Sequence, residues 1–550
     1  MTKYDVIIVG GGHAGVEAAA ASARRGAKTL LLTMRESDIG AMSCNPSMGG
    51  PGKSQMIAEI DALGGVMPRG ADAAGIHFRT LNASHGAATR ALRAQIDRNL
   101  YHNAVMKILD EYKTLDIVYA PVESVDIKNK IVNNEYEFGA IVFTTGTFLQ
   151  GLVTRGAEKI PSGRIMDNGE YQSPDTHISN VLRDAGFKLM RLKTGTPARI
   201  YRDSIDFSVC ELQPGDHPHD WFSSPNPENN FNAVCYITHT TDETHKIIRE
   251  NISGAPMYNG DIEGIGPRYC PSLEDKVMRF PSHTSHHVFL EPEGLDSDLI
   301  YPNGISTSFG ADIQDKWIRT IPGLENARIA RYGYAIEYDA IDARSINDKL
   351  QSKDIPYMFF AGQINGTSGY EEAAAQGIVA GANAAAYATN GAYLELDRTN
   401  SMIGVLIDDI TTLGIDEPYR MFTSRAEYRL SLRADNAIAR LGQMGVDCGL
   451  ITKKQYDEKY KLHKKDIEKN DKFYAGYIDR NAREIAAYKR DAELKIPNGF
   501  NYTGMPGLTN ELIEKLNETR PENIADMSRI PGMTPAGIMV VLRKIKSGNN

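Results

Sequence analysis

The sequence predicts an α/β fold in which a parallel sheet of the nucleotide-binding type is interrupted by an insertion and followed by an all-helical domain. Three observations support this prediction. A buried strand, a glycine-rich turn, an alanine-rich helix and a second strand follow one another over 3–33. A further strand, glycine-rich loop and small-residue helix occupy 357–388. After about residue 395 glycine becomes scarce, charge becomes dense and helical periodicity takes over.

The composition is that of a globular protein with several domains. The chain has 550 residues, and its net charge of −9 means that contact with nucleic acid must depend on local basic patches. Its five cysteines are odd in number and form no CxxC pair, which argues against a disulfide framework and favours a reducing cytoplasm. No apolar run is long enough for a signal peptide or a membrane span, so we expect no membrane association.

The N-terminal motif predicts a Rossmann-like dinucleotide site. Gly10, Gly12 and Gly15 have the Gly-x-Gly-x-x-Gly spacing between a strand and a helix. Small residues let the turn close and let the backbone approach a pyrophosphate, which the free amides at the helix N-terminus would bind. The second strand ends at Thr33, where a ribose-binding carboxylate is usual, and Glu36 is only a near match. The predicted cofactor contacts are Gly10, Gly11, Gly12, His13, Ala14 and Gly15.

Two later segments favour FAD over NAD at this site. The segment 140–151 is a strand that runs into a Thr-Gly turn, and 357–388 contains a helix whose N-terminus would point at a flavin ring. We therefore predict a Rossmann-like FAD-binding domain of the two-dinucleotide-domain flavoprotein type, split by a mixed α/β insertion. The predicted boundaries are 1–198 and 303–394 for the two parts of the FAD domain, 199–302 for the insertion, on the NAD and substrate side, and 395–550 for the helical domain.

Other apparent motifs are not assigned a function. "GGPGKS" at 49–54 imitates a phosphate-binding loop, but Ser47 occupies the first glycine position and we expect no strand before it. The histidines of "HPHD" (217–220) and "HTSHH" (283–287) have no carboxylate or cysteine at metal-ligand spacing. We therefore predict no metal site.

The C-terminal region contains the candidate contacts for RNA. Residues 453–495 hold 13 Lys/Arg against 9 Asp/Glu, a balance that more often marks the solvated face of helices. A better candidate for phosphate contacts is a set of arginines at helical or near-helical spacing: Arg420, Arg425, Arg429 and Arg433. The tail at 521–546 predicts a small helical hairpin for backbone phosphates or a partner protein.

Long motifs give the sequence a specific resemblance. The chain resembles the MnmG (GidA) family, the FAD-containing tRNA uridine 5-carboxymethylaminomethyl modification enzymes, from residue 4 to about 440 and again in the tail. The motifs include "MSCNPSMGGPGKSQMIAEIDALGG" (42–65), "RLKTGTPARI" (191–200), "GPRYCPSLEDKVMRF" (266–280), "LEPEGL" (290–295), "YPNGISTS" (301–308), "GQINGTSGYEEAAAQG" (362–377) and "EPYRMFTSRAEYRL" (417–430).

This resemblance implies the reaction and its components. Two copies of this chain would form a homodimer, which would assemble with two subunits of a MnmE-type GTPase into a heterotetramer. Together they would add an aminomethyl-type group to carbon 5 of the wobble uridine of certain tRNAs. Methylenetetrahydrofolate would supply the methylene carbon and glycine or ammonium the nitrogen, with FAD and NADH providing redox chemistry.

The resemblance also implies site residues. Further FAD contacts fall on Val122, Ser179 and Gln363, and the cysteines for chemistry are Cys44 and Cys270. We interpret Cys210, Cys235 and Cys448 as core residues, because they lie outside the motifs. The stretch implied for NAD comprises Gly266, Pro267, Arg268, Tyr269, Cys270, Pro271, Ser272, Leu273, Glu274, Asp275, Lys276, Val277, Met278, Arg279 and Phe280.

A thiolate explains what these cysteines could do. Its addition to carbon 6 of uracil would make carbon 5 nucleophilic toward a methylene carbon. Arg268 and Lys276 are candidates to stabilise a thiolate at Cys270, with Cys44 as an acid/base partner, although the two roles could be exchanged.

Three other functions compete with this one. A folate- and FAD-dependent tRNA 5-methyluridine methyltransferase shares the glycine motif and a cysteine mechanism, but it lacks the 417–430 segment and the helical tail. A non-catalytic flavin-dependent RNA-binding scaffold would not need Cys270. A small-molecule flavin oxidase would not need the helical extension.

Overall fold

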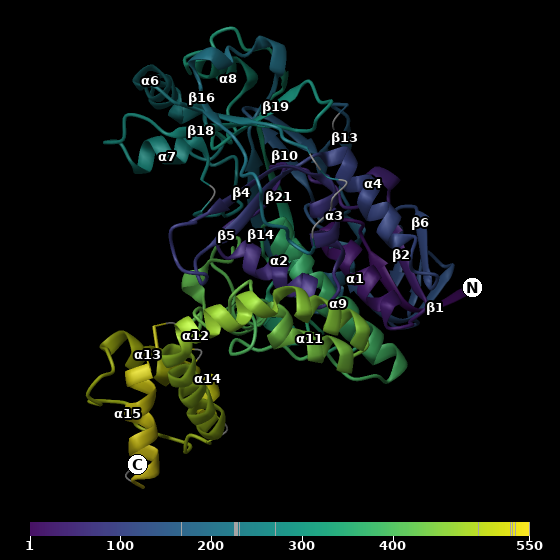
Figure 1. Cartoon of the computed structure of the whole chain (residues 1–550), viewed down its shortest axis with the longest axis vertical. Helices are drawn as coiled ribbons and strands as arrows, with labels where there is room; N and C mark the ends of the chain where they lie inside the picture. The colour runs from purple at the N-terminus through teal and green to yellow at the C-terminus, as the bar shows by residue number, and fades with distance from the viewer. Residues whose placement is uncertain are drawn as a thin grey trace.

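The structure is a computed structural model that describes residues 1–548 except 167, 225–228, 230, 270, 493, 529, 531 and 534. Figure 1 shows three lobes, and these confirm the predicted mixed α/β fold with a helical C-terminal part. The central lobe holds the N-terminal sheet. The upper lobe holds α6 (Asp242–Glu250), α7 (Leu273–Arg279) and α8 (Ala311–Ile318), and the lower lobe holds α13 (Asn510–Thr519), α14 (Ile524–Ser528) and α15 (Pro535–Lys546).

The central lobe is built on a seven-stranded sheet. Five strands run parallel in the order β6, β2, β1, β9 and β22, and an antiparallel meander of β8 and β7 extends from β9. Because β22 pairs with β9 after the whole insertion has passed, the sheet is assembled from both ends of the split domain. The strands are β1 (Thr2–Val9), β2 (Thr29–Thr33), β6 (Leu115–Tyr119), β7 (Val125–Asp126), β8 (Ile131–Val132), β9 (Tyr136–Phe143) and β22 (Met358–Phe360).

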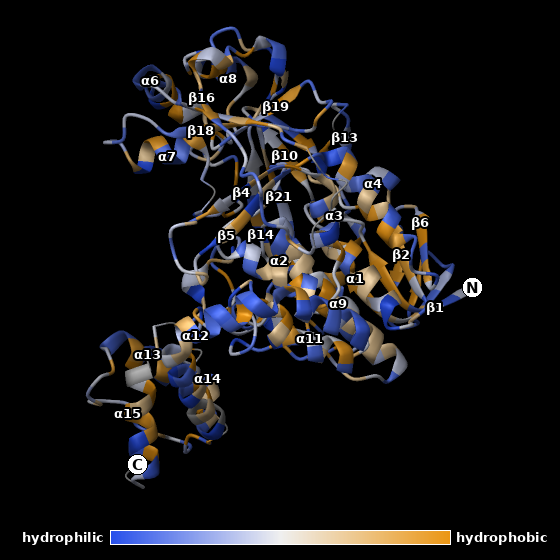
Figure 2. Ribbon diagram, in the orientation of Figure 1, coloured by the Kyte–Doolittle hydropathy of each residue, from blue (hydrophilic) through white to orange (hydrophobic). Residues whose placement is uncertain are grey.

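Two long helices pack directly on this sheet and on each other. They are α1 (His13–Arg24) and α9 (Tyr370–Thr389). Glycines explain how close they come: a Cβ added at Gly377 or Gly381 would lie 2.2 Å from a carbonyl oxygen of α1. Figure 2 shows the hydrophobic strands β1 and β2 beside these helices, where β1 is apolar and buried from Val6 to Val9.

Smaller elements surround the edge of the sheet where the parallel strands end. They are a three-stranded antiparallel sheet and a two-stranded one, with four helices. Their bounds are β3 (Ser47–Gly49), β4 (Gly75–Leu81), β5 (Ala91–Ile96), β12 (Arg164–Ile165), β13 (Tyr171–Gln172), α2 (Lys53–Ala62), α3 (Val66–Ala74), α4 (Arg98–Leu109) and α5 (His177–Asp184).

Two antiparallel sheets follow: a four-stranded sheet leads into the upper lobe, and a six-stranded sheet forms it. The first has the order β11, β10, β21 and β14, and the second has the order β16, β17, β18, β19, β15 and β20. A separate hydrophobic core around Trp317 holds the second sheet against α6, α7 and α8. The strands are β10 (Leu152–Arg155), β11 (Glu158–Pro161), β14 (Leu189–Thr196), β15 (Arg199–Tyr201), β16 (Glu211–Gln213), β17 (Cys235–His239), β18 (His287–Pro292), β19 (Leu299–Asn303), β20 (Ile329–Arg331) and β21 (Tyr334–Ile341).

The chain beyond residue 395 forms two separate packing units. Helices α10 (Met402–Asp408), α11 (Ala437–Asp447) and the start of α12 (Lys453–Ala492) contribute apolar side chains to the core of the central lobe. Helices α13, α14 and α15 enclose a core of their own. Lysine–carboxylate pairs four residues apart follow the exposed face of α12. Within the described part of the chain, no helix is long and apolar enough to cross a membrane.

Buried carboxylates join distant segments through main-chain amides. Glu17 accepts hydrogen bonds from the amides of Val66 and Met67 at the start of α3. Glu59 does the same for Met402 and Ile403 at the start of α10. An acceptor at a helix N-terminus satisfies amides that have no partner within the helix. These contacts fix α3 and α10 to the glycine-turn helix and to α2.

Candidate functional site

A cavity of about 620 Å³ lies beyond the carboxyl ends of the parallel strands. Its lining includes the residues that directly follow these strands: Gly10, Met34, Ala120, Thr144 and Ala361. Ligands of open parallel sheets bind at this edge. Of the residues predicted from the sequence, those that line the cavity are Gly10, Gly11, Gly12, His13, Ala14, Cys44, Val122, Gln363, Pro267 and Arg420.

The glycine turn has the geometry that a dinucleotide needs. Gly10 has a φ of +106°, and a Cβ at Gly15 would lie 1.8 Å from the carbonyl oxygen of Gly10. A Cβ at Gly12 would meet no atom within 4 Å, so this residue faces open space. The first turn of α1 carries no acidic side chain that would compete with an anion. Gly15 therefore closes the turn from beneath, whereas Gly12 leaves room for a ligand.

Buried polar atoms around the cavity have no partner among the described residues. They include Thr145 Oγ1 and Ser368 Oγ, which belong to cavity-lining residues, and Ser179 Oγ on α5, which lies behind the lining. A buried hydroxyl without a partner is costly, and a bound polar ligand would relieve this cost. The open Gly12, the free helix N-terminus and these hydroxyls fit FAD, which is the cofactor expected from the sequence.

His13 is a neutral histidine at the base of the cavity. Burial lowers its pKa to about 4. Its ring lies between Tyr370, at a centroid distance of 4.6 Å, and Tyr101, at 5.6 Å. Its Nε2 atom is buried without a partner among the described residues. His13 can therefore offer an uncharged nitrogen to a ligand at neutral pH.

Cys44 is held on the cavity wall by contacts on both its backbone and its sulfur. Its amide donates to the Tyr370 hydroxyl at 2.7 Å, and its carbonyl accepts from Arg98 at 2.6 Å. Its Sγ lies 3.1 Å from the Tyr301 hydroxyl and 3.8 Å from the carbonyl oxygen of Gly195. The thiol thus faces the cavity in one defined place.

Two arginines, the buried Arg199 and the half-buried Arg98, flank Cys44 and share one carboxylate. Arg98 and Arg199 donate to Glu293 Oε1 at 2.8 and 2.6 Å. Although burial opposes ionisation of Glu293, the guanidinium groups of Arg98, Arg199 and Arg331 lower its pKa to about 2. The site around Cys44 therefore keeps a net positive charge.

Lys53 is a cavity residue that the sequence analysis set aside. It donates to Glu371 at 2.8 Å and to Glu372 at 2.7 Å in the first turn of α9. The expectation that no strand precedes 49–54 is wrong, because β3 does, but β3 is a short antiparallel strand. With its ammonium engaged by two carboxylates, Lys53 does not form a phosphate-binding loop.

Asp38 is a second lining residue that the sequence analysis missed. Glu36 is exposed, whereas Asp38 is buried at the cavity, where it accepts hydrogen bonds from Arg164 at 2.5 Å and Gln172 at 2.8 Å. The one available signal was its place shortly after the end of β2. Its donors are distant in sequence and could not be predicted.

The stretch implied for NAD divides into core and surface. Leu273 and Val277 belong to the core of the upper lobe, and the buried Glu274 accepts from Ser308. Among the described residues of this stretch, Pro267 alone lines the cavity. Cys270 lies outside the described residues. The exposed side chains of the stretch are Arg268, Tyr269, Met278, Arg279 and Phe280.

Three further cysteines lie away from the cavity. Cys235 and Cys448 are buried, and Cys210 packs against the core of the upper lobe. Burial raises the pKa of Cys235 to about 12, with a smaller contribution from Glu291, so this thiol is unreactive at neutral pH.

The four arginines between 420 and 433 do not form a helical stripe, which corrects the expectation from their spacing. This segment contains turns and one short 3-10 helix, Thr423–Arg425. Arg420 lines the cavity, Arg425 lies over the Tyr419 ring at 4.2 Å, and Arg429 is exposed. Arg433 is fully buried in ion pairs with Asp435 and Asp471, which removes it from the candidate RNA contacts.

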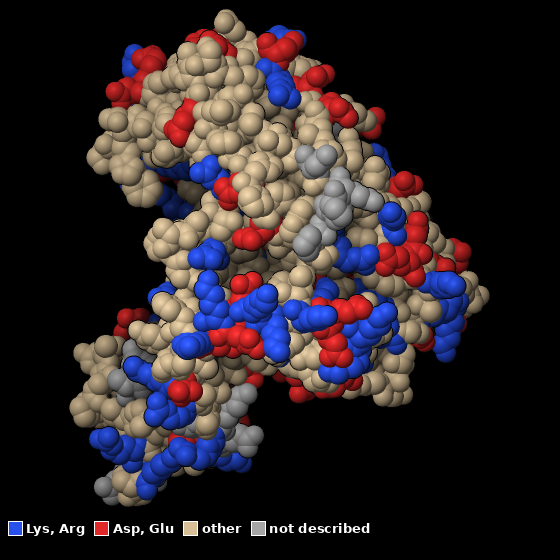
Figure 3. Space-filling model, in the orientation of Figure 1, with Lys and Arg blue, Asp and Glu red and all other residues tan. Residues whose placement is uncertain are grey.

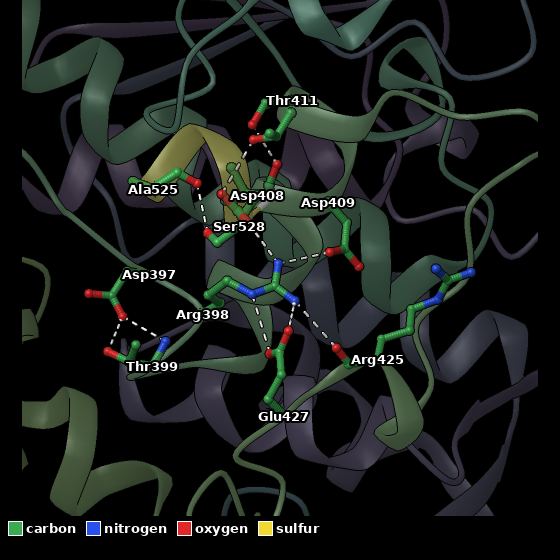
Figure 4. Close-up of polar contacts among 12 residues, drawn as sticks. Asp397, Arg398, Thr399, Asp408, Asp409, Thr411, Arg425, Glu427, Ala525 and Ser528 are labelled. Atoms are coloured by element: carbon green, nitrogen blue, oxygen red, sulfur yellow. Dashed lines mark hydrogen bonds and ion pairs between the residues drawn. The ribbon is translucent and has the colours of Figure 1, made fainter. Parts of the chain in front are cut away.

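Arg398 holds this segment in place (Figure 4). Its guanidinium donates to Asp408 at 2.6 Å, Asp409 at 2.9 Å and Glu427 at 2.7 Å. It also donates to the carbonyl oxygen of Arg425 at 3.5 Å. Asp409 in turn accepts from the hydroxyl of Tyr419 at 2.7 Å. One cation therefore connects α10 to the segment that carries Arg420 to the cavity.

The charged surface is mixed rather than uniformly basic. In Figure 3 the surface is hollowed between the upper lobe and the lobes below it, and Lys and Arg lie along the edge of this hollow. Acidic and basic atoms lie side by side across the middle of the same view. Among the described residues, no group of three or more His, Cys, Asp or Glu could hold a metal ion.

Comparisons with known proteins agree with this geometry. Residues 5–392 match the family model "Glucose inhibited division protein A", and 484–550 match "tRNA modifying enzyme MnmG/GidA C-terminal helical bundle". The chain is similar to the structure of Aquifex aeolicus GidA in two crystal forms. In form I the identity is 41% and the TM-score 0.85, covering 99% of this chain and 100% of the other. In form II they are 40% and 0.84, covering 99% and 98%.

Proposed function

The chain belongs to the GidA family of flavin-dependent tRNA-modifying enzymes, and we propose that with a MnmE-type GTPase it adds a carboxymethylaminomethyl or aminomethyl group to carbon 5 of the wobble uridine. One observation carries this proposal: the dinucleotide turn and Cys44 line the same cavity. A redox cofactor and a thiol would therefore meet in one place.

FAD would be held by the residues that fit it. The turn from Gly10 to Ala14 would bind the pyrophosphate at the N-terminus of α1, and Val122 and Gln363 line the same cavity. Ser179 would act from behind the lining. When bound, FAD would supply two-electron redox chemistry, with NADH as the reductant. In the stretch 266–280, contacts to NADH would fall to the exposed side chains of Arg268, Tyr269, Met278, Arg279 and Phe280.

Cys44 and Cys270 would activate the uridine. One thiolate adds to carbon 6, and carbon 5 then attacks the methylene carbon of an iminium formed between the folate-derived carbon and the nitrogen of glycine or ammonium, whose C=N electron pair moves to the nitrogen. A base next removes the proton from carbon 5, and the C–H electron pair restores the C5–C6 double bond as the thiolate leaves. The paired Arg98 and Arg199 beside Cys44 would stabilise negative charge at this place.

The remaining contacts concern macromolecules. The tRNA would approach along the hollow below α7, with Arg420, Arg425 and Arg429 as candidate phosphate contacts. The segment 395–550 would serve tRNA and GTPase binding, in a homodimer that joins two GTPase subunits in the cytoplasm. Sequence-specific recognition of RNA commonly targets single-stranded loops whose bases are unstacked, and an anticodon loop is of this kind.

Mass spectrometry of tRNA nucleosides tests this proposal. Cells that lack the gene should lose 5-aminomethyl-type wobble uridines, and the wild-type gene should restore them. Cys270→Ser and Cys44→Ser should fail to restore them, whereas Cys210→Ser, a matched change outside the cavity, should succeed. Loss of 5-methyluridine instead would assign the chain to the methyltransferase reaction. Full rescue by both active-site serine variants would leave only a scaffold role.

A further inference from the structure

We infer that Tyr301 is a positioning residue for Cys44. The phenol of Tyr301 donates a hydrogen bond to the Cys44 thiolate and fixes the sulfur toward the cavity. The geometry stands by itself, while the chemical use of this contact rests on the role proposed for Cys44. Both roles open to Cys44, nucleophile or acid/base, require the thiolate form at some step.

Two contacts define the position of the sulfur. The Tyr301 oxygen lies 3.1 Å from Sγ, and the carbonyl oxygen of Gly195 lies 3.8 Å away. A carbonyl oxygen can only accept, so it suits the neutral thiol. A phenol can also donate, so it suits the thiolate. The pair therefore accommodates both protonation states without moving the sulfur.

The backbone of Cys44 is fixed independently of its sulfur. Its amide donates to Tyr370 and its carbonyl accepts from Arg98. The rotation that remains free is that of the Cα–Cβ bond, which the Tyr301 contact selects. Loss of the phenol oxygen would consequently change the sulfur and leave the loop in place.

Tyr301 is itself rigid. It is 3% exposed and lies on β19, opposite Glu291 of β18. The guanidinium carbon of Arg199 lies 4.5 Å from the centre of its ring. Arg199 is fixed in turn by Glu293 and Thr196. Tyr301 comes from the upper-lobe sheet, so the inserted segment completes a site whose cysteine belongs to the central lobe.

The charged and titratable groups around Cys44 come from several elements. They are Arg98 on α4, Arg199 on β15, Glu293 after β18, Tyr301 on β19, Tyr334 on β21 and Tyr370 on α9. Glu293 is shared by both arginines, so it neutralises part of their charge. Tyr334 and Tyr370 have raised pKa values, chiefly through burial, so they stay neutral. Among the described residues, Tyr301 places its hydroxyl within hydrogen-bond distance of the Cys44 sulfur.

Alkylation of the holoenzyme by iodoacetamide tests the contact without using activity. Trypsin places Cys44 in peptide 36–53 and Cys270 in peptide 269–276, so mass spectrometry follows each thiol separately. In Tyr301→Phe we expect alkylation of Cys44 to be roughly tenfold slower at pH 7, as for loss of a hydrogen bond to a charged group. The rate should approach that of the wild type at strongly alkaline pH. Tyr4→Phe, which removes a phenol bonded to Asp116 far from the cavity, should leave the whole pH–rate profile unchanged.

The outcomes separate this inference from the proposed function. An unchanged profile, or a fall that is equal at every pH, would overturn the role of Tyr301, because packing alone alters access and not ionisation. A shifted profile with normal wobble uridines in cells would uphold the contact and refute the chemical role of Cys44. If Tyr301→Phe bound no flavin, the alkylation profiles of both full-length proteins would be compared without flavin, because the contact between Tyr301 and Cys44 is made by protein atoms alone.

Discussion

The ring of Tyr269 lies against the ring of Phe422, with centroids 4.3 Å apart. Next to it, the amide of Arg268 donates to Glu417 at 3.0 Å. These contacts join the upper lobe to the segment that Arg398 holds, and both partners adjoin cavity residues, Pro267 and Arg420. The segment at 266–269 and the segment at 417–422 are therefore joined beside the cavity.

Phe422→Ala should loosen this tie. An aromatic pair contributes about 0.5–1.5 kcal/mol, so the opened state of 266–269 should become up to roughly tenfold more populated. Trypsin cleavage after Arg268, followed by peptide mass spectrometry, should accelerate by the same factor. Phe280→Ala, which removes an exposed ring elsewhere on this stretch, is the control, and equal acceleration in both variants would contradict the role of Phe422.

Two glycines of the turn should respond differently to alanine. Gly15→Ala should prevent folding or lower the melting temperature strongly, because its Cβ would overlap the carbonyl oxygen of Gly10. Gly12→Ala should keep the melting temperature of the apoprotein and lose bound flavin, because its Cβ would occupy open space. Flavin absorbance and thermal unfolding measure both effects. Full flavin content in Gly12→Ala would show that the pyrophosphate does not lie there.

Removal of the Arg398 cation should destabilise the protein. In Arg398→Met three carboxylates lose a common partner, which should cost about 2–4 kcal/mol, since the side chain is partly exposed. Arg319→Met, which breaks an exposed pair with Asp315, should cost below about 1 kcal/mol. Urea unfolding monitored by fluorescence compares the two. Similar costs would mean that the Arg398 network contributes no more than a surface pair.

His13 should make stability depend on pH. Its pKa is about 4 in the folded chain and near 6.5 when unfolded, so the unfolded state binds more protons between these values. The stabilisation is complete above pH 6.5, is lost progressively as pH falls from 6.5 to 4, and does not change further below pH 4. The free energy of unfolding should drop by about 2 kcal/mol between pH 7.5 and 5 from this group alone. His13→Gln should remove this contribution to the pH dependence of the free energy of unfolding. An identical pH dependence in both proteins would refute the lowered pKa of His13.

Arg429 and Arg433 should separate binding from folding. Arg429→Gln should weaken tRNA binding and reduce the slope of log K against log salt by about one, as for loss of one phosphate contact. Arg433→Gln should instead lower the melting temperature, because it breaks buried pairs. Filter binding across a salt series decides the first point. An unchanged slope in Arg429→Gln would remove that residue from the interface.

The parallel sheet and its glycine turn were predictable because their signals are local. Each signal can be recognised within one short segment: the spacing of Gly10, Gly12 and Gly15 in the first case, and the strand at 357–360 in the second. Contacts between side chains that are far apart in the sequence could not be predicted in this way. Lys53 pairs with Glu371 and Glu372, and no local pattern relates these positions. The misplaced arginine stripe had the same cause: the spacing of Arg425 to Arg433 is helical, but Arg398 and the buried Arg433 pairs hold this segment in turns.

The carboxylates that accept from main-chain amides have a consequence for sequence drift. Glu17 accepts from the main-chain N–H groups of Val66 and Met67, and Glu59 accepts from those of Met402 and Ile403. Every residue except proline carries such an N–H group. Each of these contacts therefore requires a particular side chain at the glutamate and none at the residue that donates its amide. No matched pair of side chains has to change together. Homologous chains could exchange the side chains at 66, 67, 402 and 403 freely within their packing limits. The glutamates alone would have to be inherited unchanged.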